Sequence, residues 1–201
     1  MPNLKNIKKS LEIQRVVSHL FAYKGYHSTS MREIARKLGM NQSSLYHYFR
    51  SKEEILYTLM NDAIDNALST LERICASDLS PRDKLNKMLH FYTQYYAGDP
   101  ERLILLVNEQ NSLSSEHRHV LVDKQRRYIR LFQGIFQELE EHQLTKEIPR
   151  SVAIFAFLGM VHYTIKWYQK EGPVGLERLA DIFVEIFTRG ILEQDKAVDQ
   201  E

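Results

Sequence analysis

The sequence predicts an all-α protein, in which a three-helix amino-terminal head containing a helix-turn-helix is followed by a larger carboxy-terminal helical bundle. Apolar residues recur at helical spacing, clear helix start and stop residues divide the chain into about nine segments, and no segment alternates like a β-strand. The 201 residues and 43% hydrophobic content suffice for a small head and a larger core. The sequence contains no repeat and no low-complexity run.

Glycines bound the first two predicted helices. Residues 5–24 carry a continuous apolar face, and Gly25 ends it. Ser30 then supplies an N-cap, and Glu33 completes an S-x-x-E capping box, in which side chains at both positions satisfy free backbone donors. Gly39 ends the second helix, because the left-handed conformation just past a helix is most easily adopted by glycine. These two helices therefore have well-specified boundaries.

A third helix follows Asn41, a residue suited to an N-cap. Only Leu45 and Phe49 point to the core, so most of this helix faces outward. The outward groups are the amide, hydroxyls, imidazole and phenols of Gln42, Ser43, Ser44, Tyr46, His47 and Tyr48. A single aromatic at such a place is more often a core residue. The whole set instead suits the base edges of a DNA major groove, with Gln42 as the amide that pairs with a base.

Charge is divided unevenly along the chain, although the formal net charge is only +1. Residues 1–52 contain ten Lys or Arg and two acidic residues, a charge of +8, and the remainder carries −7 from 17 basic and 24 acidic residues. This division concentrates attraction for phosphate at the amino-terminal end. An ordinary solvated helix face would explain Lys5, Lys8, Lys9 and Lys24 equally well, so we do not count these four as site residues.

Helix start residues divide the rest of the chain into six segments. The predicted starts are Ser51, Ser80 with Pro81, Asp99 with Pro100, Ser114 or Ser115, Pro149, and the turn at residues 172–175. The expected helices cover residues 52–76, 81–97, 100–111, 115–142, 149–170 and 176–193. We expect a head over residues 1–51, a body over residues 52–195 and a frayed tail over residues 196–201.

The stretch between residues 21 and 56 resembles the DNA-binding region of the TetR-like (tetracycline-repressor-type) bacterial transcriptional regulators. The shared residues follow the family's order without a gap, and they are Phe21, Gly25, Thr29, Ile34, Ala35, Gly39, Leu45, Tyr46, Tyr48, Phe49, Lys52, Glu53 and Leu56. The resemblance implies a ligand-responsive regulator of transcription, most often a repressor. In it, residues 1–51 bind an operator in double-stranded DNA, and residues 52–195 bind ligand and dimerise.

The resemblance also implies which side chains meet DNA. Those matching Gln42, Ser43 and His47 face bases, and those matching Thr29, Ser44, Tyr46, Tyr48 and Lys52 hold phosphates; Arg32 suits either role, and Ser30 completes the set. The family often has glycine, alanine or proline where Ser43 stands, and the residue at the position of His47 varies. The operator sequence is therefore not implied.

The last two expected helices carry more apolar surface than a monomer of this size needs. The apolar residues of the final helix occupy over half of its circumference. Together with the preceding helix they suit a four-helix interface between two copies related by a twofold axis, where the resembled family forms its dimers. The expected interface residues are Phe155, Leu158, Gly159, Trp167, Leu179, Phe183, Ile186 and Phe187. An intramolecular core is the alternative that the pattern leaves open.

Aromatic and polar residues of the body predict a pocket for a small hydrophobic effector. The expected contacts are Tyr92, Tyr95, Tyr96, Asn108, Arg127, Tyr128 and Phe132, although helical spacing alone would make each aromatic a core residue. Residues 159–192 also resemble the body of a TetR-like subgroup that senses acyl-coenzyme A thioesters and controls fatty acid or steroid breakdown. A multidrug-type regulator that senses aromatic or cationic xenobiotics is the alternative.

Other classes of protein are less well supported. The single Cys75 excludes an internal disulfide, and the sequence shows no nucleophile elbow, Gly-rich phosphate loop or H-E-x-x-H, so we expect no enzyme, catalytic residue, metal or cofactor. Glu138, Glu141 and His142 have metal-compatible spacing, which a small all-helical metal enzyme would use, but they suit an exposed helix end. An architectural DNA protein without sequence preference also remains open. The longest apolar run, residues 152–161, is too short to span a membrane, so we expect a cytoplasmic protein without membrane contact.

Overall fold

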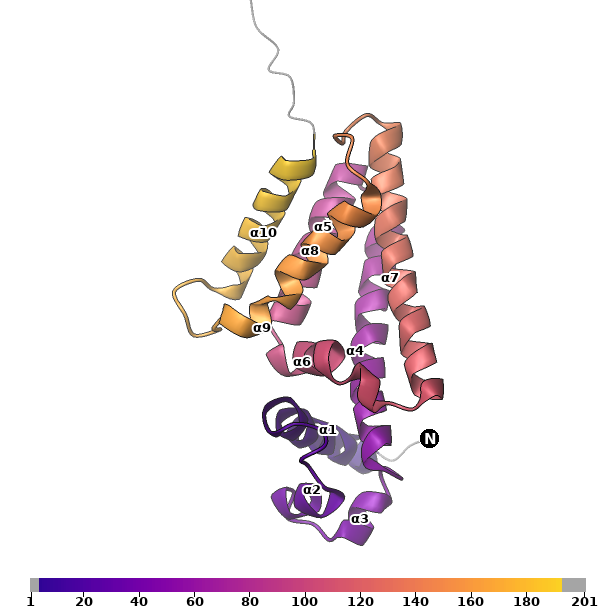
Figure 1. Ribbon diagram of the computed structural model, residues 1–201, viewed down its shortest axis with the longest axis vertical. Coiled ribbons are helices and arrows are strands. Elements are labelled where there is room, and N and C mark those ends of the chain that lie inside the picture. The colour runs from indigo at the N-terminus through magenta and orange to yellow at the C-terminus, as the bar shows by residue number, and fades with distance from the viewer. Residues whose placement is uncertain (1–3, 193–201) are drawn as a thin grey trace, which may run out of the picture. The chain divides into compact units, whose positions relative to one another are not determined.

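A computed structural model describes residues 4–192 of the chain and shows an all-helical fold (Figure 1). The chain divides into two compact units. The first comprises the described parts of Met1–Asn66 and Asp99–Lys124, and the second those of Ala67–Gly98 and Gln125–Glu201. Two long helices, α4 (Lys52–Cys75) and α7 (Ser115–Glu141), contribute residues to both units. The predicted tail at residues 196–201 lies outside the described residues.

The first unit contains the predicted head and a segment from later in the chain. Its helices are α1 (Leu4–Lys24), α2 (Met31–Lys37), α3 (Gln42–Tyr46), the start of α4, α6 (Pro100–Asn108), the 3-10 helix η1 (Gln110–Ser112) and the start of α7. Its core is built from side chains that are almost completely buried, including Ile13, Phe21, Ile34 and Leu45. The short α2 and α3 are therefore held by their apolar faces, and their polar faces are left outside.

The second unit is a bundle in which α5 (Pro81–Ala97), α8 (Arg150–His162) and α10 (Leu176–Ile191) pack on one another (Figure 1). Near the end of α10, an isolated antiparallel bridge joins Thr145 to Leu192, and Lys146 donates its backbone N–H to the Ile191 carbonyl at 2.9 Å. This bridge is the only extended pairing among residues 4–192, so the prediction of an all-α fold is confirmed.

The nine predicted helices are all present within residues 4–192, and one of them is divided. Tyr163 separates α8 from α9 (Thr164–Trp167) inside the predicted segment 149–170. The buried hydroxyl of Thr164 donates to the Val161 carbonyl at 2.6 Å, which satisfies an acceptor at the break. Tyr168 then adopts an extended backbone and ends α9 earlier than predicted.

Side-chain caps fix where several of the helices begin. The hydroxyls of Ser51 and Ser80 accept the backbone N–H groups of Glu54 and Asp83 at 3.0 and 3.2 Å, and the Asp99 carboxylate accepts that of Arg102 at 3.0 Å. Each bond satisfies one of the donors that a helix leaves free in its first turn. The predicted starts at these three positions are therefore confirmed.

Candidate nucleic-acid interface

The capping box of α2 fixes the entry into the helix-turn-helix. The Ser30 hydroxyl accepts the Glu33 backbone N–H at 3.2 Å, and the Glu33 carboxylate binds the Lys24 ammonium at 2.6 Å. The pKa of Glu33 is lowered, first by the Lys24 hydrogen bond and also by the backbone of Ser30. Gly25 and Gly39 have positive φ values of 96° and 62°, as expected for the residues that end α1 and α2.

The third helix is shorter than the sequence predicts. It ends at Tyr46, and the backbone N–H groups of His47 and Tyr48 donate to carbonyls three residues earlier, in a tightened turn. Asn41 occupies the N-cap as predicted, although its side chain makes no cap hydrogen bond. Phe49 lies beyond the helix yet is only 5% exposed, and Leu45 is completely buried. These two side chains anchor α3 and direct its other groups outward.

The polar face of α3 is available to a partner. Gln42, Ser43, Tyr46 and His47 are exposed, as is Arg32 on α2, while Ser44 and Tyr48 are half-buried. Among the residues that the structure describes, none of these side chains makes a hydrogen bond or ion pair with another protein group. The donors and acceptors of these seven side chains are therefore free to bind a partner.

Thr29 and Lys52 are used inside the first unit. Thr29 is 2% exposed, and its hydroxyl donates to the Gly25 carbonyl at 2.9 Å. The Lys52 ammonium donates to the carbonyls of Tyr26 and Thr29 at 2.8 and 2.9 Å and lies 4.1 Å from the Tyr26 ring centroid. Burial lowers the pKa of Lys52. Lys52 thus ties the first residue of α4 to the loop before α2, and these two hydrogen bonds use two of its three N–H bonds.

The start of α4 is also tied to the start of α7 within the first unit. The Glu53 carboxylate accepts the Ser114 backbone N–H at 2.9 Å and contacts the His117 ring at 2.8 Å. These hydrogen bonds, led by that of the Ser114 backbone, lower the pKa of Glu53. The His117 ring stacks on Tyr57 at 3.9 Å between centroids. Sequence spacing did not reveal the Glu53 contacts, because their partners lie 61 and 64 residues away in the chain.

The predicted effector residues fall into two groups. The first group is buried together in the second unit and consists of Tyr92, Tyr96, Tyr128 and Phe132. Tyr95 is half-buried at its edge, with its ring centroid 5.0 Å from that of Tyr96. Asn108 is exposed at the end of α6 in the first unit, and Arg127 is exposed and paired with Glu72 at 2.6 Å. The structure therefore does not bring Asn108 and Arg127 into this aromatic cluster.

Two hydroxyl contacts give the aromatic cluster its polarity. The Tyr96 and Tyr128 hydroxyl oxygens are 2.6 Å apart, and the Tyr92 hydroxyl lies 3.0 Å from His162 Nε2. Burial lowers the pKa of His162 and raises those of Tyr92 and Tyr128. Sequence analysis missed His162. An imidazole directly after the apolar run 152–161 is a signal that could have revealed it. The cluster is thus largely apolar with a few internal hydrogen-bonding groups.

The predicted dimer residues also divide. Phe155, Trp167 and Ile186 are exposed by 60%, 52% and 58%, and Gly159 on α8 is exposed as well. Leu158, Leu179, Phe183 and Phe187 are buried in the core of the second unit itself. Val152 and Tyr163, exposed by 59% and 65%, were not predicted. The second unit therefore carries exposed large apolar side chains on α8, α9 and α10.

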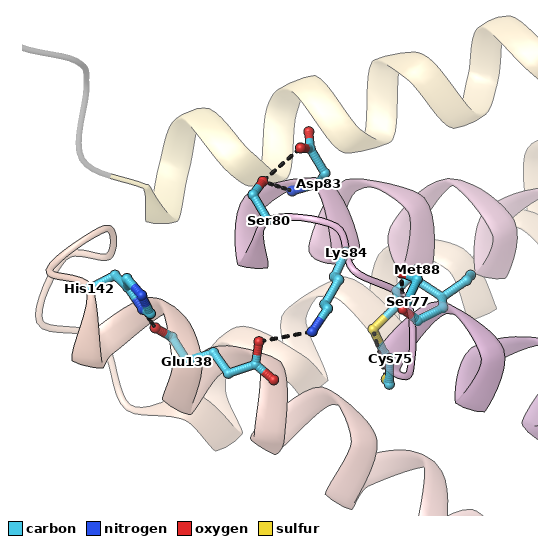
Figure 2. A network of polar contacts seen from close by, with 9 residues as sticks. Cys75, Ser77, Ser80, Asp83, Lys84, Met88, Glu138 and His142 are labelled. Carbon is cyan, nitrogen blue, oxygen red and sulfur yellow. Dashed lines mark hydrogen bonds and ion pairs between the residues drawn. The ribbon is translucent and has the colours of Figure 1, made fainter.

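The side chains with potential for metal or redox chemistry have structural partners (Figure 2). The Glu138 carboxylate binds the Lys84 ammonium at 3.2 Å, and the His142 ring contacts the Glu138 carbonyl at 2.7 Å. Cys75 is half-buried, with its sulfur 3.7 Å from that of Met88, and burial raises its pKa. In the described part of the chain, no three His, Cys, Asp or Glu residues are grouped to hold a metal ion.

None of the helices in the described residues is both long and apolar enough to cross a membrane.

Comparison with known protein families identifies the chain. Residues 18–58 match the model of the bacterial regulatory proteins of the tetR family, and residues 78–191 match that of the tetracyclin repressor-like C-terminal domain. The second match alone covers more than half of the chain. The chain belongs to the TetR family. It is accordingly a DNA-binding regulator of transcription, with a helix-turn-helix near its amino terminus and a helical carboxy-terminal domain.

Several relatives are similar to this TetR-family chain over most of their length. The transcriptional repressor KstR2 of Mycobacterium tuberculosis is 21% identical over 91% of this chain and 92% of its own. The solved structure of KstR2, a ketosteroid transcriptional regulator, superposes with a TM-score of 0.87 over 92% and 96% of the two chains at 19% identity. The fatty acid metabolism regulator protein of Bacillus subtilis is 22% identical over 91% and 95%.

One solved structure similar to this chain contains both an acyl-coenzyme A and operator DNA. This structure is that of AibR in complex with isovaleryl coenzyme A and operator DNA. AibR is 26% identical to this chain, and the match covers 88% of this chain and 96% of AibR. Its TM-score against this chain is 0.79. The fold of the present chain is therefore one on which an operator and an acyl-coenzyme A are both bound by a relative.

Proposed function

We propose that this protein is a dimeric repressor that binds a palindromic operator through α3 and is released from it by a small hydrophobic effector. The observation that carries the proposal is the polar face of α3, where Gln42, Ser43 and His47 are exposed and uncommitted among the described residues. Such groups discriminate base edges in a major groove, whereas Ser44, Tyr46, Tyr48 and the remaining N–H of Lys52 contact the phosphates. Arg32 and Ser30 lie on the same helix-turn-helix.

Dimerisation supplies the second half of the operator contact. The exposed Phe155, Trp167 and Ile186 support a twofold interface formed by α8, α9 and α10, because isolated proteins rarely expose several such side chains together. Two heads would then occupy successive major grooves, whose centres repeat every 34 to 36 Å or about one helical turn. In this proposal, residues 1–51 are the DNA-binding domain, and residues 52–195 bind ligand and dimerise, in the cytoplasm.

The effector is proposed to enter the aromatic cluster of the second unit. An acyl chain would pack against the apolar rings of Tyr92, Phe132 and their neighbours where these rings move apart to admit it, and its carbonyl would suit the buried hydroxyls. AibR and the Bacillus subtilis fatty acid metabolism regulator support an acyl-coenzyme A as the effector. A cationic xenobiotic remains the second candidate, because stacked aromatics are the usual partners of organic cations.

Release requires only a modest free energy. If the effector favours a conformation of the dimer that fits the operator less well, the coupling equals the difference in binding free energy between the two conformations. A hundredfold release corresponds to about 2.7 kcal/mol, since each tenfold step is about 1.4 kcal/mol. This amount is comparable with the contribution of a few side-chain contacts.

The test begins by selecting genomic fragments with the full-length protein and measuring their affinity by fluorescence anisotropy. We expect a roughly palindromic site, and an affinity for it that acyl-coenzyme A thioesters of some chain length lower at least about tenfold. Free coenzyme A is the control for the acyl chain, and a planar cationic dye tests the second candidate. Equal affinity for all duplexes would indicate an architectural protein, and equal operator affinity with every compound would refute effector release.

A further inference from the structure

A groove of about 540 Å³ lies between the first turns of α1 and the carboxy-terminal end of α3. It is lined by Asn6, Ile7, Ser10, Ser44, His47 and Tyr48. Asn6 and Ser10 are four residues apart on α1, so they lie on one face of that helix. Ser44, His47 and Tyr48 border the polar face of α3. The groove therefore continues the proposed DNA surface onto α1, a helix outside the predicted set of DNA contacts.

The chemistry of the lining is that of a surface for phosphate oxygens. The five polar side chains among its described lining residues all contain N–H or O–H groups that donate hydrogen bonds, and none is engaged by another side chain among residues 6–192. No carboxylate lines the groove. A phosphodiester offers only acceptors, so donors without competing acids match it. The residues around the groove belong to the segment 1–52, whose charge is +8.

Other grooves of the same unit lack this character. The groove between α1, α4 and α6 is lined by Asp62, Asp99 and Glu101 in addition to Arg15 and Arg102. A third, on the side of α1 that faces Lys37, includes Glu12 and Glu101. Carboxylates in both would repel a nucleic-acid strand. A small organic ligand is a less suitable occupant of the α1–α3 groove, because Ile7 is the one aliphatic side chain among the described residues that line it.

We propose that the groove between α1 and α3 seats the sugar–phosphate backbone of the operator strand that borders the base-contacting face, so that Asn6 and Ser10 are DNA ligands. The proposal rests on the proposed function, and it adds the start of α1 to the contact surface. Because the contact is to the backbone, it contributes to affinity for every duplex and carries no base preference. It also holds α3 at a fixed depth in the major groove.

Charge introduced at Ser10 tests the groove directly. Ser10→Glu places a carboxylate against the phosphates, and we expect binding at least about tenfold weaker on operator and on random duplex alike. Ser10→Lys adds one ion pair, so the plot of log affinity against log salt steepens by about 0.9 per head. Ser69→Glu and Ser69→Lys, at an exposed serine of α4, are the matched controls and are expected to bind like the wild type.

A second variant separates binding from folding. Asn6→Asp is nearly isosteric at an exposed position in the first turn of α1, where an acidic residue stabilises a helix. We expect it to unfold at the same temperature as the wild type or higher, and to bind every duplex more weakly. The groove assignment is overturned if the Ser10 and Asn6 variants bind like the Ser69 controls while the wild type still selects an operator. Failure of the wild type to select any duplex overturns the proposed function instead.

Discussion

Gln42 is the side chain on α3 best suited to discriminate one base pair. It is exposed at the first residue of the helix, and its amide both donates and accepts, as pairing with adenine in a major groove requires. We expect Gln42→Ala to change which base is preferred at one position of each half-site, with a loss of discrimination of about 1–3 kcal/mol. Selection from a randomised operator library measures this preference.

The control for Gln42 is the same substitution at an exposed glutamine of α7. Gln137→Ala should leave the base preference unchanged. A Gln42→Ala protein that loses affinity equally for all sequences would show that Gln42 contacts the backbone or supports the fold. The sequence was sufficient to predict that Gln42 faces outward, because only Leu45 and Phe49 in this segment have apolar side chains at core spacing. The base that Gln42 selects is set by the position of its amide in the bound duplex, which periodicity does not encode.

Lys52 shows where residue-level prediction reaches its limit. The sequence placed its ammonium at the DNA surface, but two of its hydrogen bonds go to the Tyr26 and Thr29 carbonyls. These partners lie 26 and 23 residues away in the chain. Periodicity and capping describe neighbours within about two helical turns, so they contain no information about such contacts.

The contact between α4 and the loop before α2 predicts a stability effect. Lys52→Met leaves the Tyr26 and Thr29 carbonyls without their donor, so we expect the free energy of unfolding to fall by about 1–3 kcal/mol. Binding to every duplex should weaken as well, since α2 and α3 lose an anchor. Lys52→Arg should recover only part of both losses, because a planar guanidinium differs from a compact ammonium in its hydrogen-bond geometry. Denaturant unfolding and anisotropy measure the two effects.

Lys37→Met provides the comparison for Lys52, because Lys37 is an exposed lysine in the last turn of α2. It should unfold like the wild type and reduce DNA affinity only through the lost charge. If Lys52→Met unfolds at the same denaturant concentration as Lys37→Met, the anchoring role is wrong. A salt dependence that becomes shallower by about 1 in Lys52→Met would show that its third N–H contacts a phosphate.

The contact between the first turns of α4 and α7 predicts a pH dependence of stability. Hydrogen bonds from Ser114 and His117 lower the pKa of Glu53 in the folded protein. The stabilisation is therefore present above the pKa of an unfolded glutamate, about 4.3, and is lost as the pH falls through the lower folded value. We expect Glu53→Gln to be less stable than the wild type at neutral pH and the difference to shrink below about pH 4.3. Urea unfolding across this range checks it.

Glu116→Gln, at an exposed position in the first turn of α7, is the control for the pH series. Its stability relative to the wild type should change little with pH. A Glu53→Gln difference that stays constant down to the acid transition would mean that the charge of Glu53 contributes nothing to this contact. Local signals predicted where α4 and α7 begin, but the contact between their first turns arises from the tertiary fold.

The whole molecule separates a basic head from an acidic remainder. The +8 on residues 1–52 attracts phosphate, whereas the −7 on the rest discourages binding of nucleic acid elsewhere. This separation, the nine predicted helical segments and the helix-turn-helix could all be read from the sequence, because composition, capping and helical periodicity are local properties. The division of apolar residues between core and dimer surface was not. Leu179 and Ile186 both satisfy the periodicity of α10, and only the packed bundle shows that Leu179 is buried and Ile186 is 58% exposed.

The exposed apolar residues of the second unit predict a dimer that a single charge weakens. Burying Ile186 or Phe155 against a second copy contributes about 1.5–3 kcal/mol per side chain, and a twofold axis uses each position twice. We expect Ile186→Glu and Phe155→Glu to raise the dimer dissociation constant at least about a hundredfold, corresponding to about 2.7 kcal/mol. Sedimentation velocity measures the mass, and operator affinity should fall with it, because one head contacts only a half-site.

Val107→Glu distinguishes loss of the interface from a general effect of charging an exposed apolar site. Val107 is 45% exposed on α6 in the first unit, and no dimer contact is proposed for it. This variant should keep the dimer mass and the operator affinity of the wild type. If Ile186→Glu and Phe155→Glu also remain dimeric at nanomolar concentration, the twofold interface does not use the exposed faces of α8 and α10. Operator recognition by paired heads would then need a different surface to hold them together.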